Sequence, residues 1–520
     1  MALLGTTSQH HLSVQLQRHL AQRPMLQSRL QNTAKLIRTT TMVRKVAVIG
    51  AGASGAATAA ALHAEDGFDT IKVFERRETA GGTWIYDADP DDIPITPGAL
   101  PPEIDQPISP PQQFPAITAP STQNRFEKTP IYEELTTNVP DVAMSFSDMP
   151  FAYGPFVPHH IPRQYIENYF SWHQLDKLLH TRTTVENVLA IANDRWKLTL
   201  RKHDAARRVD EWREEEFDAV VIANGHYAVP FVPYVPGLDD WLSRFPGRVQ
   251  HSKTYRSPRV YENQRVLVIG NSASGYDVAH QLVASKLLRG PLYVSRRSRG
   301  RWDGREPPDG MLWKPVITEF RKDGTIVFED SSTLEDIDRV IYCTGYQASY
   351  PFWDKRNGTP IFDYKNQRLV NNYQHTFVRG RPTLALVGFP RVLTFRSFEY
   401  QAIAIARFWS GHNAFSMPSN AEQKKWEENR IELTRREHRR FHQIDWDDGE
   451  TMEWFEWLYR FAGLPHIEGH GKHPPILNSQ TRWAIEHIRK YPEHGGDQEA
   501  IGMQGLEIAS ERKKDSLWFV

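Results

Sequence analysis

Cysteine is nearly absent from this sequence, since Cys343 is the only one among 520 residues. A single thiol excludes an internal disulfide, a Cys-x-x-Cys redox pair and a cysteine-rich zinc site, so we predict no metal site and a reducing compartment. Net charge is absent as well, because 63 basic side chains balance 63 acidic ones, and no general attraction to nucleic acid is expected. No run of about 18 apolar residues occurs, so no transmembrane span is predicted.

Acidic residues are missing from residues 1–44, which carry six Lys and Arg side chains. This composition resembles that of a mitochondrial transit peptide. The alternative is a disordered leader, or an upstream extension of a chain that starts at Met42. In either case we exclude residues 1–44 from the fold. We expect a cytoplasmic protein, or a mitochondrial one if the segment is a true transit peptide.

A glycine-rich turn follows the apolar strand KVAVI and precedes a helix of small residues. Gly50 permits a tight bend, Gly52 lets a pyrophosphate approach the backbone, and Gly55 lets the helix pack closely on the strand. The phosphates are expected at the helix N-terminus, with Ser54 among the cofactor-binding residues. Glu75 ends the second strand, 20 residues after Gly55, where a carboxylate accepts ribose hydroxyls and repels a 2′-phosphate.

A second turn of the same kind, VIGNSASG, ends at Gly275. Gly270 and Gly275 stand at the expected positions, but Ser272 replaces the middle glycine. Serine is small enough for the backbone to reach a pyrophosphate, and its hydroxyl could add a hydrogen bond. We therefore predict a second dinucleotide site, with Ser274 also among its contacts.

The second strand of this unit ends in three residues without an acid, Ser295, Arg296 and Arg297. Arg296 lies 21 residues past Gly275, at the place that Glu75 occupies in the first unit. An arginine there suits a ribose with a 2′-phosphate, which it binds through forked, charge-assisted hydrogen bonds. The alternative is an exposed strand end without a ligand. The two units are thus predicted to prefer different dinucleotides.

Five motifs follow one another in a fixed order along the chain. They are GGTW at 81–84, LTTN at 135–138, FPGRVQHSKTYR at 245–256, GNSASG at 270–275 and CTGY at 343–346. Together they resemble the flavin-containing monooxygenases over residues 43–411. Cys343 stands where the family has alanine, which is a tolerated exchange of small residues. The proline-rich segment 89–129 is longer than in the animal enzymes of the family, so nothing is carried over there.

The resemblance implies FAD in the first unit and NADPH in the second, with dioxygen and a small molecule as the other reactants. NADPH would reduce FAD, O2 would add to form a C4a-hydroperoxyflavin, and a soft nitrogen or sulfur nucleophile would attack its distal oxygen. The protein supplies binding and orientation, because the cofactor carries the chemistry.

The resemblance also implies two catalytic amides. Asn138 would lie beside the flavin, and Gln401 near it. A neutral amide can hydrogen-bond a peroxide without offering a general acid that hastens its loss. The alternative for Asn138 is a turn residue before Pro140. The remaining cofactor-binding residues implied by the motifs are Gly82, Trp84, Thr344 and Gly345.

The fold implied is α/β, with two doubly wound Rossmann-like domains and the smaller NADPH domain inserted in the FAD domain. Proline excludes a helix or a central strand from segment 89–129, which we interpret as a surface insertion. The charged helical region after the second domain is interpreted as a solvated helix face. The predicted segments are 1–44 (leader), 45–227 (FAD domain, first part), 228–338 (NADPH domain), 339–420 (FAD domain, second part) and 421–520 (helical C-terminal region).

Two other functions share these features. A Baeyer–Villiger monooxygenase, which acts on ketones, has Trp-Pro after the signature histidine, whereas this chain has Tyr255 and Arg256 after His251. We interpret His251 as a structural link between the two domains rather than an acid or base. A non-enzymatic dinucleotide sensor is the alternative from another class. A homo-oligomer is left open.

Overall fold

The computed structural model describes residues 43–151, 154–465 and 469–491. The predicted leader lies outside the described residues, apart from its last two positions. Within these ranges no helix is both long and apolar enough to span a membrane. The same ranges contain no group of His, Cys, Asp and Glu side chains that is arranged to hold a metal ion.

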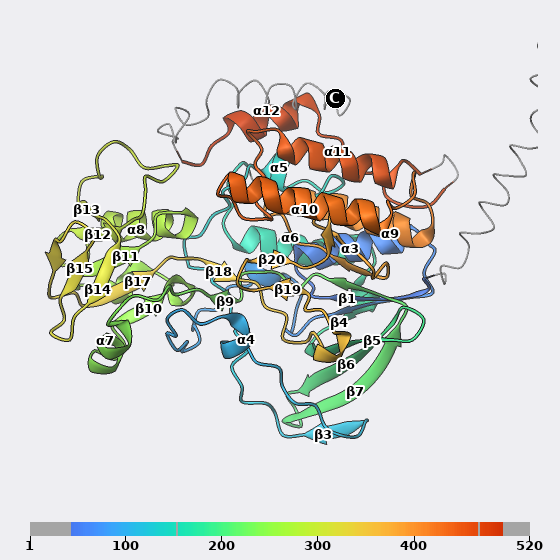
Figure 1. Cartoon of the computed structure of the whole chain (residues 1–520), viewed down its shortest axis with the longest axis horizontal. Helices are drawn as coiled ribbons and strands as arrows, with labels where there is room; N and C mark the ends of the chain where they lie inside the picture. Colours follow the sequence, from blue (N-terminus) through green and yellow to red (C-terminus); the bar gives the residue numbers. More distant parts are fainter. Residues whose placement is uncertain (1–42, 152–153, 466–468, 492–520) are drawn as a thin grey trace, which may run out of the picture. The chain divides into compact units, whose positions relative to one another are not determined.

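The first Rossmann-like unit is built on a seven-stranded sheet (Figure 1). Its order is β21 (Asn372–Tyr373), β22 (Phe377–Val378), β23 (Leu384–Leu386), β8 (Ala219–Ile222), β1 (Lys45–Ile49), β2 (Thr70–Phe74) and β4 (Leu179–His180). The strands from β23 to β4 run parallel, and β21 and β22 are antiparallel additions. Every side chain of β8 and nearly every one of β1 is buried, as expected for parallel strands covered on both faces.

The second Rossmann-like unit has a five-stranded, fully parallel sheet. Its order is β10 (Val249–His251), β17 (Arg339–Tyr342), β11 (Val266–Ile269), β12 (Leu292–Ser295) and β13 (Met311–Lys314). Strand β17 pairs with β10 and β11, although the boundary predicted at residue 338 assigns it to the first domain. The second unit therefore extends through Tyr342. The boundary is wrong because the sheet to which a buried strand belongs depends on distant pairing, which the local pattern does not contain.

An antiparallel four-stranded sheet joins the first unit, in the order β3 (Ala116–Thr118), β7 (Val209–Phe217), β6 (Arg195–Asp204) and β5 (Thr183–Ile191). Strand β3 comes from the proline-rich segment, which also forms the helical turn α4 (Pro101–Ile104). The expectation that this segment contains no helix is wrong for that one turn, because proline is tolerated where N–H groups lack helical partners. The segment also reaches the interior, since Arg125 is buried and pairs with Asp105 at 3.1 Å.

Short strands and helices complete the fold. The short strands are β9 (Val229–Pro230) with β18 (Tyr346–Gln347), β14 (Ile317–Phe320) with β15 (Ile326–Phe328) and β16 (Thr333–Leu334), and β19 (Phe362–Asp363) with β20 (Arg368–Leu369). The helices are α3 (Ala53–Ala64), α5 (Asp141–Met144), α6 (His160–Trp172), α7 (Leu238–Arg244), α8 (Ala273–Ser285), α9 (Phe395–Ser410), α10 (Asn420–Arg436), α11 (Glu450–Ala462) and α12 (Ser479–His487). Most side chains of α10 are solvated as predicted, but one face is buried and carries charged groups.

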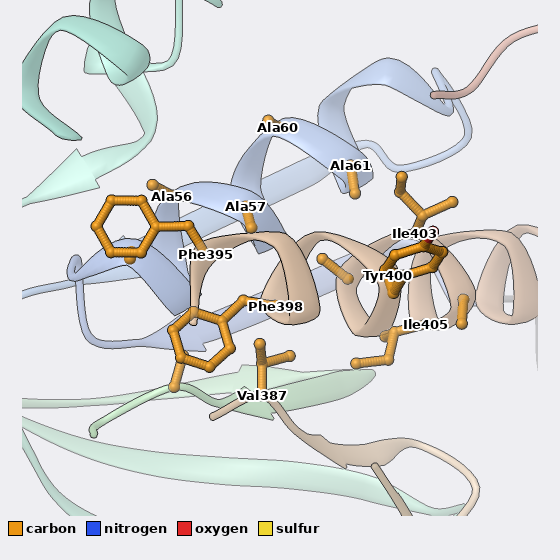
Figure 2. Close-up of a cluster of buried hydrophobic side chains, with 14 of the residues drawn as sticks. Ala56, Ala57, Ala60, Ala61, Val387, Phe395, Phe398, Tyr400, Ile403 and Ile405 are labelled. Carbon is orange, nitrogen blue, oxygen red and sulfur yellow. The ribbon is translucent and has the colours of Figure 1, made fainter. Parts of the chain in front are cut away.

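Helices α3 and α9 pack together beside the first sheet, and their contact forms the centre of the largest core cluster (Figure 2). Ala57 and Ala61 of α3 point toward α9, which carries larger buried side chains such as Phe395 and Ile403. Small residues let the two backbones approach closely, and burial of each large apolar side chain contributes roughly 1.5–3 kcal/mol. This packing holds the N-terminus of α3 in place at the end of β1.

Candidate functional site

The turn between β1 and α3 has room for backbone but not for side chains. At Gly50, φ is +105° and an added Cβ would lie 2.6 Å from the Ala223 carbonyl oxygen. At Gly55 it would lie 1.9 Å from the Gly50 carbonyl oxygen. Gly52 is the N-cap of α3, and a Cβ on Gly82 would lie 2.7 Å from its Cα. The turn therefore presents bare backbone at a helix N-terminus, which fits the pyrophosphate of FAD.

Glu75 lies beside this turn with its carboxylate fixed by the backbone. Its Oε2 accepts the N–H of Ala51 at 2.8 Å, and its Oε1 accepts the N–H of Arg77 at 2.8 Å. An ionised carboxylate has about four lone-pair sites, so acceptor capacity remains for ribose hydroxyls. Glu75 and Ser54 are both buried. The residues at this turn fit the adenosine half of FAD, as the sequence predicts.

The GGTW motif and the start of α9 surround the same turn. The ring of Trp84 is half-buried and meets Phe395, the first residue of α9, edge to face at 6.4 Å. Gly388, which follows β23, lies close to the turn, because a Cβ there would be 3.7 Å from Ser54 Oγ. Three segments far apart in the sequence thus meet at the N-terminus of α3.

Ser272 occupies in the second turn the place of Gly52 in the first. Both residues are N-caps, with φ and ψ of −83° and −168° at Ser272 and of −77° and −168° at Gly52. Any L residue adopts these extended angles, so serine fits without strain. Glycine is required elsewhere, since φ is +103° at Gly270 and a Cβ on Gly275 would lie 2.0 Å from the Gly270 oxygen. Ser274 follows in the first turn of α8.

The two arginines after β12 differ in their surroundings. Arg296 Nη1 pairs with Asp303 Oδ2 at 2.7 Å, and its guanidinium lies 3.4 Å from the ring centroid of Trp313. Arg297 is exposed, and within the described part of the chain it has no ion-pair partner. Arg296 is therefore already oriented by the protein, whereas the charge of Arg297 is available to an anion. The predicted 2′-phosphate contact therefore rests most directly on Arg297, and contact of Arg296 with that phosphate stays a prediction.

Asp303 is a site residue that the sequence analysis missed. Besides Arg296, its Oδ2 accepts the side-chain amide of Asn271 and the N–H of Gly300, each at 2.7 Å. These bonds fasten the segment after β12 over the turn after β11. No local sequence signal identifies an aspartate in this role. Ser295 is buried, and its hydroxyl donates to the carbonyl of Pro315 at 2.8 Å.

The two predicted catalytic amides lie in different surroundings. Asn138 is exposed in a bend before α5, and no side-chain hydrogen bond is present within the described residues. Gln401 is fully buried in α9, and its Nε2 donates to Phe389 O at 2.8 Å and to Thr376 Oγ1 at 2.9 Å. Its Oε1 accepts the N–H of Gly388 at 3.2 Å. Gln401 thus positions the segment after β23, and the catalytic role of either amide stays a prediction.

Thr344 and Gly345 lie where the chain returns from the second unit. The Thr344 hydroxyl donates to Phe231 O, and the Phe231 N–H donates to Gly345 O at 3.0 Å. His251, at the end of β10, meets Tyr346 edge to face at 5.1 Å. Burial lowers the pKa of His251 to about 3, so it stays neutral and is no acid near neutral pH. These contacts favour structural roles for Thr344, Gly345 and His251 where the chain passes between the two units. The predicted cofactor contacts of Thr344 and Gly345 stay predictions.

A small cavity lies at the C-terminal end of β8, lined by Ile222, residues 224–226, residues 386–389 and Tyr350. His226 is 6% exposed, and neither ring nitrogen has a hydrogen-bond partner among the described residues. Burial, together with the positive charge of Arg391, holds the pKa of His226 well below its usual value. The sequence analysis missed this residue. Its position directly after a parallel strand is the signal that could have identified it, because ligands bind at such ends.

Comparison with known proteins agrees with this geometry. A family model described as flavin-binding monooxygenase-like matches residues 121–302 and 309–453. A model for an NAD(P)-binding Rossmann-like domain matches residues 48–99, which contain the first glycine turn. The two matches together cover both turns and most of the described residues.

Curated relatives and solved structures include similar enzymes. Flavin-containing monooxygenase FMO GS-OX-like 2 of Arabidopsis thaliana is 31% identical over 452 residues, which are 82% of this chain and 87% of the relative. The structure of S-allyl-L-cysteine S-oxygenase from Allium sativum is 27% identical, with a TM-score of 0.67 over 90% of this chain and 99% of that one. A cyclohexanone monooxygenase mutant from Rhodococcus sp., bound to NADP+, is 15% identical with a TM-score of 0.52 over 75% and 91%, which shows the fold alone.

These matches confirm the predicted α/β fold with Rossmann-like units and the predicted enzyme class. FAD and NADPH are the cofactors of that class, and both turns fit dinucleotides. The chain therefore belongs to the flavin-binding monooxygenase-like family and is a FAD-dependent monooxygenase that uses NADPH.

Proposed function

We propose that this enzyme oxygenates a soft sulfur or nitrogen atom of a small molecule, with FAD in the first unit and NADPH in the second. The observation that carries the proposal is the contrast between the two turns. A fixed carboxylate at the first, Glu75, suits unmodified ribose hydroxyls. Arginines at the second, Arg296 and Arg297, suit a 2′-phosphate. Such a pair supplies a resident flavin and an exchangeable reductant.

Arg256 supports sulfur or nitrogen oxygenation over the Baeyer–Villiger reaction. Its buried guanidinium donates to the backbone carbonyls of Asp87, Thr129, Lys253 and Tyr255 at 2.5–3.1 Å. These bonds tie both ends of the proline-rich segment to residues 253–256 of the signature motif. A proline at this position, as in the Baeyer–Villiger signature, would remove all four. The relative from Allium sativum, whose name states S-oxygenation, also favours sulfur.

The protein's own side chains have limited tasks in this reaction. Bound FAD would supply the redox chemistry, taking a hydride from NADPH and activating dioxygen in the manner that the family resemblance implies. Asn138 would donate an amide hydrogen bond to the reacting oxygen without releasing a proton. Gln401 would hold the segment 386–389 against the flavin side of the first turn. The buried, neutral His226 would line the space next to it.

The test is an NADPH-consumption assay with the FAD-loaded enzyme and three substrates, a dialkyl sulfide, a tertiary aryl amine and a cyclic ketone. Products are identified by mass, and hydrogen peroxide is measured in parallel. We expect the sulfide or the amine to gain one oxygen atom, with little peroxide, and the ketone to stay unchanged. A lactone from the ketone, with no sulfoxide or N-oxide, would establish the Baeyer–Villiger alternative. No NADPH consumption with any substrate would favour the sensor.

A further inference from the structure

Three arginines that form no ion pair among the described residues come from three different parts of the fold. Arg297 follows β12 in the second unit, Arg391 follows β23 in the first, and Arg440 lies between α10 and α11. All three are exposed, and within residues 43–151, 154–465 and 469–491 none has an ion-pair or hydrogen-bond partner for its guanidinium. Arg391 lies over the ring of Tyr227, 5.1 Å from its centroid.

Two contacts bring these segments together. The rings of Phe389 and His442 lie 4.8 Å apart, so the segment that carries Arg440 packs against the segment that carries Arg391. Arg301 pairs with Asp447 at 3.4 Å, which joins the loop after Arg297 to the same C-terminal segment. The segments that carry the three arginines therefore meet between the two Rossmann-like units and the C-terminal helices.

Within the described residues, no carboxylate forms an ion pair with Arg440, and the charges that act on it are those of Arg391 and Arg297. Although more than a third of Arg440 is exposed, partial desolvation of its guanidinium, together with the positive charges of Arg391 and Arg297, lowers the pKa of Arg440. At the adjacent Arg439, burial acts in the same direction, but the carboxylates of Glu450 and Glu437 outweigh it and raise the pKa. Glu437, Asp448 and Glu450 thus pair with Arg439, and no acid of the described residues compensates the charge of Arg440.

His226 is an independent indication that a ligand binds at this place. The ring of His226 lies 4.3 Å from that of Tyr227, which the Arg391 guanidinium covers, and 5.1 Å from that of Phe389, two residues before Arg391. His226 therefore lies close to the segment that carries Arg391. Both nitrogens are buried without a hydrogen-bond partner in the described chain. A buried polar group without a partner is costly, and a neutral imidazole offers one N–H donor and one acceptor.

We propose that Arg297, Arg391 and Arg440 form a binding site for one anionic oxygen group, a phosphate or a carboxylate, of a small molecule bound beside His226. Two sources supply that chemistry, the 2′-phosphate of NADPH and a carboxylate on the oxygenated substrate. Forked guanidinium groups suit either anion. The inference rests on the proposed function only in its choice of these two ligands. Arg391 and Arg440 are new to the site, whereas Arg297 is already predicted to bind the 2′-phosphate.

The experiment measures equilibrium binding to the FAD-loaded full chain by calorimetry, without turnover. The variant is Arg391→Gln with Arg440→Gln, which removes two uncompensated charges and breaks no ion pair of the described residues. One arm compares NADP+ with NAD+, and the other compares 3-(methylthio)propionate with the neutral 3-(methylthio)propan-1-ol. Arg208→Gln is the matched control, because that arginine is exposed in the turn between β6 and β7.

In one arm we expect the Kd of the anionic ligand to rise by at least about tenfold, because charge-assisted bonds are lost. The Kd of its neutral or unphosphorylated counterpart should stay within about twofold. The arm that responds identifies the source of the anion, and Arg391→Lys with Arg440→Lys should restore much of the affinity. An unchanged Kd in both arms, or an equal change for both members of a pair, would overturn the proposal.

Failure of the proposed function is a separate outcome of this design. If the wild-type enzyme binds the anionic ligand in an arginine-dependent way but forms no oxygenated product, the anion site stands and the reaction assignment falls. If sulfoxide forms but neither Kd depends on the two arginines, the reaction stands and the anion site falls. The binding should also weaken with added salt, as expected for contacts between charges.

Discussion

Glu75→Gln tests the first nucleotide site most directly. The wild-type side chain is 6% exposed, and its two oxygens accept the N–H groups of Ala51 and Arg77, both at 2.8 Å. A glutamine keeps one acceptor but turns an amide NH2 toward the other donor, so one charge-assisted bond is lost. Hydrogen bonds to charged groups contribute about 1.5–3 kcal/mol each. We expect the free energy of unfolding of the apoprotein to fall by that amount.

The affinity for FAD should fall in addition, because the ribose hydroxyl then meets a neutral amide. Loss of a second charge-assisted bond, again about 1.5–3 kcal/mol, corresponds to roughly a 10- to 150-fold increase in the Kd. The Kd is measured by titrating the apoprotein with FAD and following flavin fluorescence. The free energy of unfolding comes from urea denaturation of the same apoprotein.

Glu186→Gln is the matched control for this substitution. Glu186 is also buried, and it accepts from Arg125 and Arg201, both at 2.8 Å, in the antiparallel sheet away from the turn. Its replacement should lower stability and leave the Kd for FAD unchanged. An unchanged Kd in Glu75→Gln would refute the ribose assignment. An equal rise in both variants would show that general destabilisation, and not a lost ribose contact, weakens FAD.

Four further predictions follow from the site. Arg296→Ala with Arg297→Ala should weaken NADPH binding by about 1.5–3 kcal/mol per lost charged bond, and equal loss for NADH in the same titration would contradict the 2′-phosphate assignment. Asn138→Ala should divert NADPH oxidation to hydrogen peroxide, and an unchanged product-to-NADPH ratio would leave it a turn residue. Gln401→Met should lower the free energy of unfolding by about 1–3 kcal/mol for each buried group left unpaired, as measured in urea. Burial lowers the pKa of Lys253 from 10.5 to about 7. Between these pH values the folded state binds fewer protons than the unfolded state, so the free energy of unfolding should rise with pH there. This rise should be absent in Lys253→Met, and an equal dependence of the free energy of unfolding on pH in both proteins at pH 7–10 would contradict it.

The local features of both turns are predictable because they depend on neighbours in the sequence. Gly50 and Gly270 need a positive φ, and Gly55 and Gly275 must approach the preceding turn, so their types follow from backbone sterics. The angles at Ser272 explain why serine is accepted at the middle position alone. Helix α3, the strands beside it and the assignment to two Rossmann-like units follow from the same short-range patterns.

Other features depend on which distant segments meet. The sheet that contains β17 is decided by its pairing with β10 and β11, and the boundary predicted at residue 338 was therefore wrong. The same holds for the proline-rich segment, whose edge strand and buried Arg125 depend on partners far along the chain.

The amino-acid sequence by itself determined that two dinucleotide turns exist and that their charges differ, because strand, turn and terminal acid or arginine lie within about thirty residues of one another. The tertiary structure alone decided that Asp303 engages Arg296, while Arg297 has no ion-pair partner among the described residues. It also decided that the segments that carry Arg391 and Arg440 pack together beside His226. The physical reason is that electrostatic coupling depends on distance in space, and only the packing of the units sets that distance.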